Sequence, residues 1–103
     1  MGFTILVVED DHDSRVSLRQ ILEAEGYCVL STIHGSEAMT LLKRDPTPNA
    51  VLLDLNLPTQ SGQNFIDSKM QDAALRSIPI ILLRKPIDFK KLLGELQTVF
   101  KSE

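Results

Sequence analysis

The feature that most constrains the fold is an alternation, along the whole chain, between short apolar runs and amphipathic stretches. The runs Thr4–Val8, Tyr27–Thr32, Ala50–Leu53 and Ile78–Leu83 are largely apolar at consecutive positions, which is typical of strands covered on both faces. A helical pattern follows each run, so strands and helices alternate. This order predicts an α/β fold with a parallel sheet of about four strands and four helices.

Capping residues mark some of the expected helix boundaries. We expect Asp13 or Ser14 to cap the first helix, which extends to about residue 25, and Ser36 to cap the second. The third helix is predicted over about 63–70. The fourth begins near Asp88 and carries a long apolar stripe on one side.

Length and composition limit the class of protein. A chain of 103 residues that is 43% hydrophobic and 24% charged is typical of one globular domain. No apolar run approaches the length of a membrane span, and the first residues lack a basic signal region, so we expect a cytoplasmic protein without membrane contacts. A net charge of −3 without a basic stripe argues against nucleic-acid binding. Cys28 is the only cysteine, which excludes an internal disulfide, and we expect its thiol to be buried.

Acidic residues come directly after the first and third predicted strands. Glu9, Asp10 and Asp11 follow the first, and Asp54 follows the third. The carboxyl ends of parallel strands lie at one edge of the sheet, so these carboxylates converge if the two strands are neighbours. Clustered carboxylates repel unless a cation joins them, and oxygen ligands suit Mg²⁺. A carboxylate beside Mg²⁺ can attack phosphorus and form an aspartyl phosphate.

Two other interpretations of these acids stay open. The first acidic run can simply stabilise the N-terminus of the first helix, where negative charge is favoured. Alternatively, Asp54 can be the nucleophile of a Mg²⁺-dependent phosphohydrolase, with Asp11 as the acid/base group. Nothing in the sequence supplies the substrate cap that such an enzyme needs. The position of Asp54, before a loop with Pro58 and Gly62, favours the metal site.

Three motifs together resemble the receiver domain of two-component response regulators. They are ILVVEDD at 5–11, VLLDLNLP at 51–58 with Gly62 behind it, and LRKPI at 83–87 before the last helix. Asp10 and Asp54 are 44 residues apart, and Pro58 and Gly62 follow Asp54 by four and eight residues, spacings that the family shares. The resemblance covers nearly the whole chain and implies a flavodoxin-like, doubly wound parallel sheet.

The resemblance also implies a role for each matching residue. Asp54 would be the phosphoacceptor, and Lys85 would contact the phosphoryl group. Glu9 and Asp10 would hold Mg²⁺ together with Asp54 and the backbone carbonyl of Asn56.

The function implied is a stand-alone receiver over residues 1–103 with no output domain. It would accept a phosphoryl group from a histidine kinase or phosphotransfer protein and serve an unknown effector or act as a phosphate sink. It would catalyse only its own phosphorylation and dephosphorylation, so we do not expect an enzyme. The alternative is a receiver-like module that binds protein partners without phosphorylation.

The second half is shorter than the family pattern by about one helix and one strand. Only 31 residues separate Asp54 from Lys85. Counting forward from Asp54, Arg84 falls where the family has a Ser or Thr that bonds the phosphoryl group. Counting back from Lys85, Leu82 falls at the family's aromatic switch position. Arg84 is then either a substitute phosphate contact or a solvated charge at the strand end.

The shortening also predicts a new sheet edge. The run Ile80–Leu83 would form an apolar edge strand, which pairs with another chain unless it is covered. We therefore expect a homodimer, formed through this edge or through an exchanged last helix. Because the family's switch residues are absent, a phosphorylation signal would leave through the first or last helix.

Overall fold

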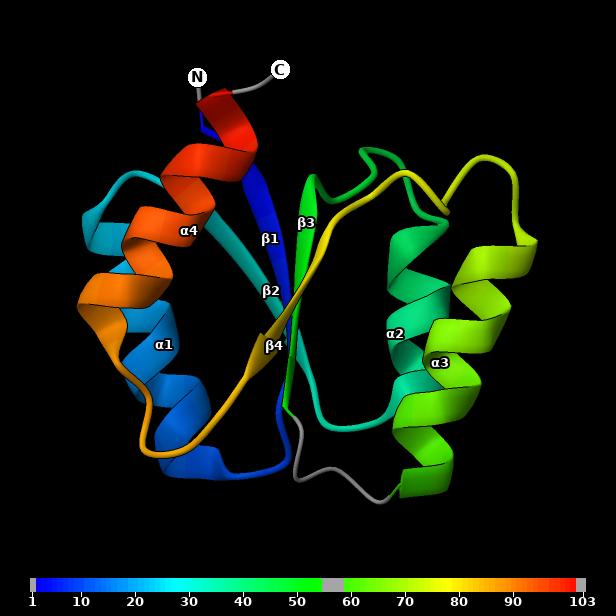
Figure 1. Cartoon of the computed structure of the whole chain (residues 1–103), viewed down its shortest axis with the longest axis horizontal. Helices are drawn as coiled ribbons and strands as arrows, with labels where there is room; N and C mark the ends of the chain where they lie inside the picture. The colour runs from blue at the N-terminus through cyan, green and yellow to red at the C-terminus, as the bar shows by residue number, and fades with distance from the viewer. Residues whose placement is uncertain (1, 55–58, 102–103) are drawn as a thin grey trace.

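The computed structural model describes residues 2–54 and 59–101, with only the backbone at 59–61. Strands and helices alternate through these residues (Figure 1). The strands are β1 (Thr4–Val8), β2 (Cys28–Thr32), β3 (Ala50–Asp54) and β4 (Ile80–Leu83). The helices are α1 (His12–Ala24), α2 (Gly35–Leu42), α3 (Thr59–Gln71) and α4 (Phe89–Lys101).

The four described strands form one parallel sheet in the order β2-β1-β3-β4. Helices α1 and α4 cover one face, and α2 and α3 cover the other (Figure 1). This is the doubly wound, flavodoxin-like architecture that the sequence predicts, with four strands and four helices. The order places β1 and β3 side by side in the middle of the sheet, so the residues that follow them share one end of the molecule.

The continuous apolar runs are explained by two cores, one on each face of the sheet. Ile5 and Val7 of β1 pack in the core under α1 and α4, while Leu6 and Val8 pack in the core under α2 and α3. Successive side chains of a strand point to opposite faces, so a strand buried on both faces needs apolar residues throughout. The apolar stripe of α4 covers the first core with its buried residues Leu92, Leu96 and Phe100.

Several boundaries differ from those predicted. Helix α1 is capped by Asp11, whose side chain accepts a hydrogen bond from the Ser14 amide at 2.8 Å, and not by Asp13 or Ser14. Helix α2 begins at Gly35, after His34 as its N-cap, instead of being capped by Ser36. Helix α3 begins at Thr59, four residues before the predicted start.

Two further corrections concern β-strand residues. Strand β4 begins at Ile80 and not at Ile78, because the Ile78 amide donates to the Leu75 carbonyl in the preceding turn. Cys28 is exposed and not buried. It is the first residue of β2, an edge strand, so its side chain lies outside both cores.

Strand β4 shows how the sheet and the last helix are formed although the second half is shortened. It pairs with β3 and runs directly through Lys85 into α4, which lies on the same face as α1 (Figure 1). One strand thus takes the sheet position next to β3 and also carries the lysine, two tasks that the family pattern divides between two strands. The Lys85–Pro86 peptide bond is cis.

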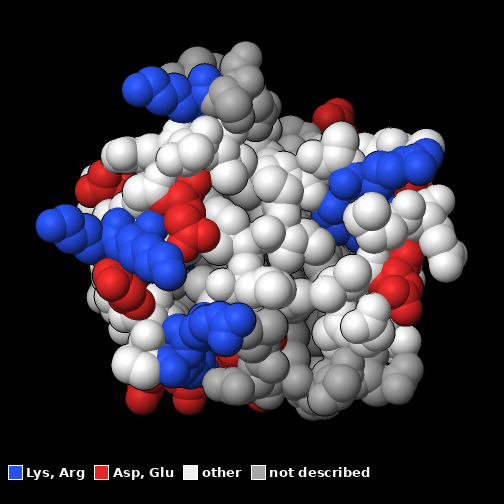
Figure 2. Space-filling view, viewed as in Figure 1, with Lys and Arg blue, Asp and Glu red and all other residues white. Residues whose placement is uncertain are grey.

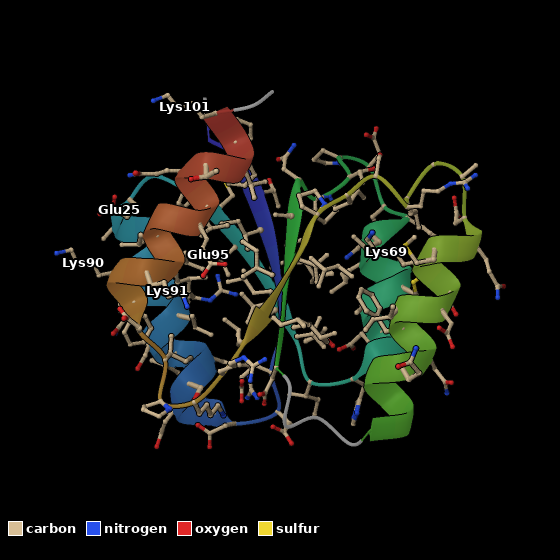
Figure 3. The ribbon with its side chains drawn as sticks, viewed as in Figure 1. Glu25, Lys69, Lys90, Lys91, Glu95 and Lys101 are labelled. Atoms are coloured by element: carbon tan, nitrogen blue, oxygen red, sulfur yellow. The ribbon has the colours of Figure 1, made fainter. Side chains whose placement is uncertain are left out.

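Two buried features connect the elements away from the sheet. Phe3 stacks on Phe100 of α4 with ring centroids 4.2 Å apart, which ties the start of β1 to the last helix. Lys69 of α3 is buried, and its ammonium donates to the Arg76 carbonyl at 3.1 Å, in the turn that leads to β4 (Figure 3). Among the helices described, none combines the length and apolar character needed to cross a membrane.

Candidate functional site

Three of the four acidic residues predicted to converge meet at the carboxyl ends of β1 and β3, whereas Asp11 caps α1. Val8 pairs with Leu53, so Glu9 and Asp54 extend the two central strands side by side. Carboxylate oxygens of Glu9, Asp10 and Asp54 all lie within 4.8 Å of one another. Glu9 and Asp54 are buried and Asp10 is exposed, so the group opens to solvent on the Asp10 side.

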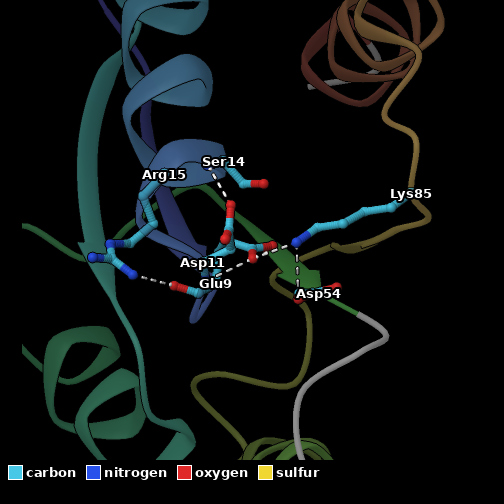
Figure 4. A network of polar contacts seen from close by, with 6 residues as sticks. All are labelled: Glu9, Asp11, Ser14, Arg15, Asp54 and Lys85. Atoms are coloured by element: carbon cyan, nitrogen blue, oxygen red, sulfur yellow. Dashed lines mark hydrogen bonds and ion pairs between the residues drawn. The ribbon is translucent and has the colours of Figure 1, made fainter.

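Glu9 is held by contacts from several parts of the chain (Figure 4). Its Oε1 atom accepts a hydrogen bond from Lys85 Nζ at 2.7 Å and from the Asp11 amide at 2.9 Å. Arg15 Nη1 donates to the Glu9 backbone carbonyl at 3.0 Å. The Oε2 atom is buried and makes no hydrogen bond with any residue of the described ranges. The carboxylate is therefore fixed in direction, with one oxygen left to bind something else.

Lys85 joins the two central strands. Besides its bond to Glu9, its ammonium lies 3.7 Å from Asp54 Oδ2. The lysine reaches the site because β4 is parallel to β3, with Leu83 opposite Asp54 and Lys85 two residues further on. Its side chain is about one-third exposed, while those of both acids are fully buried. A single cation thus partly neutralises two buried carboxylates.

The electrostatics of the site follow from this packing. Burial raises the pKa of Glu9, and the neighbouring Asp54 raises it further, while the hydrogen bonds from Lys85 and the Asp11 amide lower it. The hydrogen bond to Glu9 raises the pKa of Lys85 above its ordinary value. Lys85 therefore stays an ammonium ion at neutral pH.

One residue that shapes the site, Arg15, was missed in the sequence, whereas Asp11 has the helix-capping role that the alternative interpretation gave to the first acidic run. The cap of α1 is Asp11, and the hydrogen bond from Ser14 lowers the pKa of that carboxyl. Arg15 clamps the backbone at Glu9 from the first turn of α1. The only signal was the position of Arg15 four residues after Asp11, which places both at the start of one helix, over the end of β1.

Other predicted residues lie apart from the acids or outside the described part. Arg84 is exposed, lines the groove between β4 and α4, and makes no hydrogen bond or ion pair with any described residue. Asn56 and Pro58 lie outside the described residues, so the ligand role of the Asn56 carbonyl stays a prediction. The strand end opposite Asp54 is Leu83, which has no hydroxyl group.

The donor set fits a hard divalent cation. Three carboxylates supply only oxygen atoms, and Glu9 Oε2 is a buried acceptor that the described residues leave unsatisfied. Oxygen ligands with a few carboxylates and an open side for water are the environment that Mg²⁺ prefers. The residues present therefore fit Mg²⁺.

The fold and the site define a class: a doubly wound parallel α/β domain with an acidic group and a lysine at the carboxyl ends of its central strands. A family model described as the response regulator receiver domain matches residues 5–92. The chain therefore belongs to the receiver domain family of two-component response regulators.

Similar proteins agree with this assignment. The polar-differentiation response regulator DivK of Brucella anthropi is 35% identical over 81 residues, which cover 79% of this chain and 65% of DivK. The chain thus spans just under two thirds of the length of the curated relatives it matches. The chemotaxis response regulator CheY4 of Vibrio cholerae superposes with a TM-score of 0.85 at 22% identity, over 96% of this chain and 99% of CheY4.

A second similar structure contains a metal. It is the receiver domain of the sensor histidine kinase PA1611 of Pseudomonas aeruginosa, with a magnesium ion coordinated in its active-site cleft. The TM-score is 0.83 at 23% identity, over 95% of this chain and 97% of that chain. At this identity the comparison shows the common fold.

Proposed function

We propose that this receiver accepts a phosphoryl group on Asp54, in a Mg²⁺-dependent reaction, from a histidine kinase or a phosphotransfer protein. The observation that carries the proposal is the position of Lys85, whose ammonium lies between Glu9 and Asp54 beside the three-carboxylate group. This arrangement supplies a nucleophile, a cation for the transferred group and oxygen ligands for a metal within one small volume.

Glu9, Asp10 and Asp54 would hold the Mg²⁺ ion, together with the backbone carbonyl of Asn56. When bound, the ion neutralises negative charge on the transferring phosphoryl group. Glu9 Oε2 is available for the ion or for one of its water ligands, since Glu9 Oε1 is already used by Lys85 and the Asp11 amide.

The residues of the chain perform the rest of the reaction. A carboxylate oxygen of Asp54 attacks the phosphorus of a phosphohistidine, the new O–P bond forms and the P–N bond breaks. The donor ring, protonated at its other nitrogen, keeps the electron pair and leaves as neutral imidazole. Lys85 Nζ is 3.7 Å from Asp54 Oδ2, close enough to move onto a phosphoryl oxygen and form a charge-assisted hydrogen bond.

The biological setting is part of the proposal. The chain would act in the cytoplasm as a stand-alone receiver, either passing the signal to an effector or serving as a phosphate sink. It would turn over only its own aspartyl phosphate. The effector would bind α1 or α4, the two helices that cover one face of the sheet (Figure 1).

A second candidate is a phosphorylation-independent interaction module. One observation favours it. Leu83 lies opposite Asp54 on β4 and is followed by the exposed Arg84, so neither residue offers a hydroxyl group that could hydrogen-bond a phosphoryl group on Asp54. In such a module the acidic residues would be present but would not take part in phosphoryl transfer.

The two candidates differ in one measurement, which is intact mass after incubation with acetyl phosphate and Mg²⁺. The proposal expects a mass increase of one phosphoryl group, lost when Mg²⁺ is chelated and absent in Asp54→Asn. Asp67→Asn, at an exposed acid on α3, is the matched control and should be phosphorylated normally. A folded wild-type chain that gains no phosphoryl group would support the interaction module instead.

A further inference from the structure

The edge of the sheet at β4 carries an inference that goes beyond phosphoryl acceptance. Strand β4 pairs with β3 on one side, and no described strand pairs with its other side. Figure 1 shows β4 at the front of the molecule between α4 and α3, and none of the described helices or strands lies over its outer edge. Figure 2 shows an uncharged band through the middle of the same face, with charged side chains on both sides of it.

The outer edge of β4 has backbone N–H and C=O groups that can pair with another strand. The Val51 amide donates to the Pro79 carbonyl at 2.9 Å, so Pro79 and the residues two and four positions later turn their backbone groups toward β3. The N–H and C=O groups of Ile80 and Leu82 therefore point to the open side. The amide hydrogen that Pro79 lacks belongs to the β3 side, so the proline does not interrupt the free edge.

Within this edge strand, Leu82 presents an apolar side chain to solvent. Leu82 is 48% exposed although it lies within a strand, whereas its neighbours Ile81 and Leu83 are 7% and 3% exposed. Leu82 belongs to neither core, and it lies on the same face as Ile80, which packs against the core under α2 and α3. An unpaired apolar edge strand of this kind is the usual template for pairing with another chain.

We propose that β4 pairs antiparallel with β4 of a second copy of this chain, in a twofold-symmetric homodimer with one continuous sheet. Outward-facing residues must lie opposite one another, which allows an axis at Leu82 or at Ile81. In either register Leu82 packs against an apolar side chain, the partner's Leu82 or the partner's Ile80, and the free backbone groups of both edges are satisfied.

The charges beside the edge also suit a second copy. A groove of about 550 Å³ runs between β4 and α4, and its lining includes Lys91 and Glu95 of α4 (Figure 3). These two charges are opposite in sign, and Asp88, just before α4, adds a second negative charge to the lining. A twofold axis reverses their order in the second copy, so Lys91 would face the partner's Glu95 and the reverse. A surface that is complementary to itself is what an isologous dimer requires.

The inference does not depend on phosphorylation, so it is tested without a phosphoryl donor or Mg²⁺. Sedimentation velocity from about 5 to 500 µM should show a concentration-dependent shift from monomer to dimer, as expected for a small interface. Leu82→Lys places a charge against the same charge of the second copy or against an apolar side chain, depending on the register, and should weaken the dimer by about tenfold or more. Met70→Lys is the control, because Met70 is 52% exposed and belongs to α3 and not to the edge strand.

A charge exchange gives a second test that does not alter the strand. Lys91→Glu alone should weaken the dimer, and Lys91→Glu with Glu95→Lys should restore it. Circular dichroism would confirm that each variant is folded. A monomer throughout the concentration range overturns the proposal. A dimer whose affinity does not change in Leu82→Lys also overturns it, and this is the result expected if the two copies exchange α4. Open-ended oligomers overturn it as well.

Discussion

The middle of the sheet and its β4 edge differ in how completely they are packed. Strands β1 and β3 are buried on both faces, with Ile5, Leu6 and Leu52 all at 0% exposure, and their carboxyl ends carry the acidic group. Strand β4 has four residues, of which Leu82 is 48% exposed, and it is followed by one helix. The proposed phosphoacceptor site therefore lies mainly on the two central strands and takes only Lys85 from the segment that follows β4.

This difference separates two properties that a receiver usually combines. Accepting a phosphoryl group needs carboxylates at fixed positions, which the packed central strands provide. Reporting it needs an element with two arrangements that respond differently to the phosphoryl group. The central strands of this chain are suited to the first task, while the elements that the family uses for the second are shortened.

Truncating one leucine in each region should show the largest contrast. Leu52→Ala removes a fully buried side chain from the middle of the sheet and should lower the free energy of unfolding by about 2–5 kcal/mol. Leu82→Ala, at a concentration where the chain is monomeric, should change it by no more than about 0.5 kcal/mol. Urea denaturation measures both. Equal losses would mean that β4 is as tightly packed as β3.

Replacing Lys85, the site residue that follows β4, should impair the phosphorylation of Asp54 more than the stability of the fold. Lys85→Gln takes away the cation that lies between Glu9 and Asp54, and the rate of Asp54 phosphorylation by acetyl phosphate should fall by about 100-fold. The rate is followed by intact mass. Lys90→Gln, at an exposed lysine of α4, should leave it unchanged. An unchanged rate in Lys85→Gln would contradict a role for this lysine in the transfer.

The smallest effect concerns Lys69, which ties α3 to the turn before β4. Burial lowers the pKa of Lys69 below its ordinary value of 10.5. Between the lowered and the ordinary value the unfolded chain binds more protons than the folded chain, so stability rises with pH there. The stability of the wild type relative to Lys69→Met should therefore increase with pH in this window, as measured by urea denaturation at several pH values. A constant difference would contradict the expectation.

The parts that could be predicted from the sequence have local causes. Each strand is a short apolar run, and apolar residues on consecutive positions fit a buried parallel strand. The convergence of Glu9, Asp10 and Asp54 followed from the rule that parallel strands end at one edge. Lys85 was assigned from its motif alone, because nothing local indicates that a residue 76 positions from Glu9 will bond to it at 2.7 Å.

The parts that were wrong or missed depend on competition between similar residues or on tertiary packing. Asp11, Asp13 and Ser14 can all cap a helix, and the chain direction after β1 selects Asp11. The exposure of Cys28 depends on β2 being an edge strand, which is a property of the strand order. The clamp from Arg15 to the Glu9 carbonyl depends on how α1 sits over β1.

The stacking of Phe3 on Phe100 has a practical consequence. The two rings bring the first and last described segments together at the end of the sheet opposite Asp54 (Figure 1). A fluorescent label or an affinity tag attached near Phe3 or near Phe100 would therefore lie far from the proposed phosphoacceptor, Asp54. The same proximity makes a circular permutant feasible: a short linker could join the two ends, with new ends opened in the exposed turn at Ala73 and Ala74.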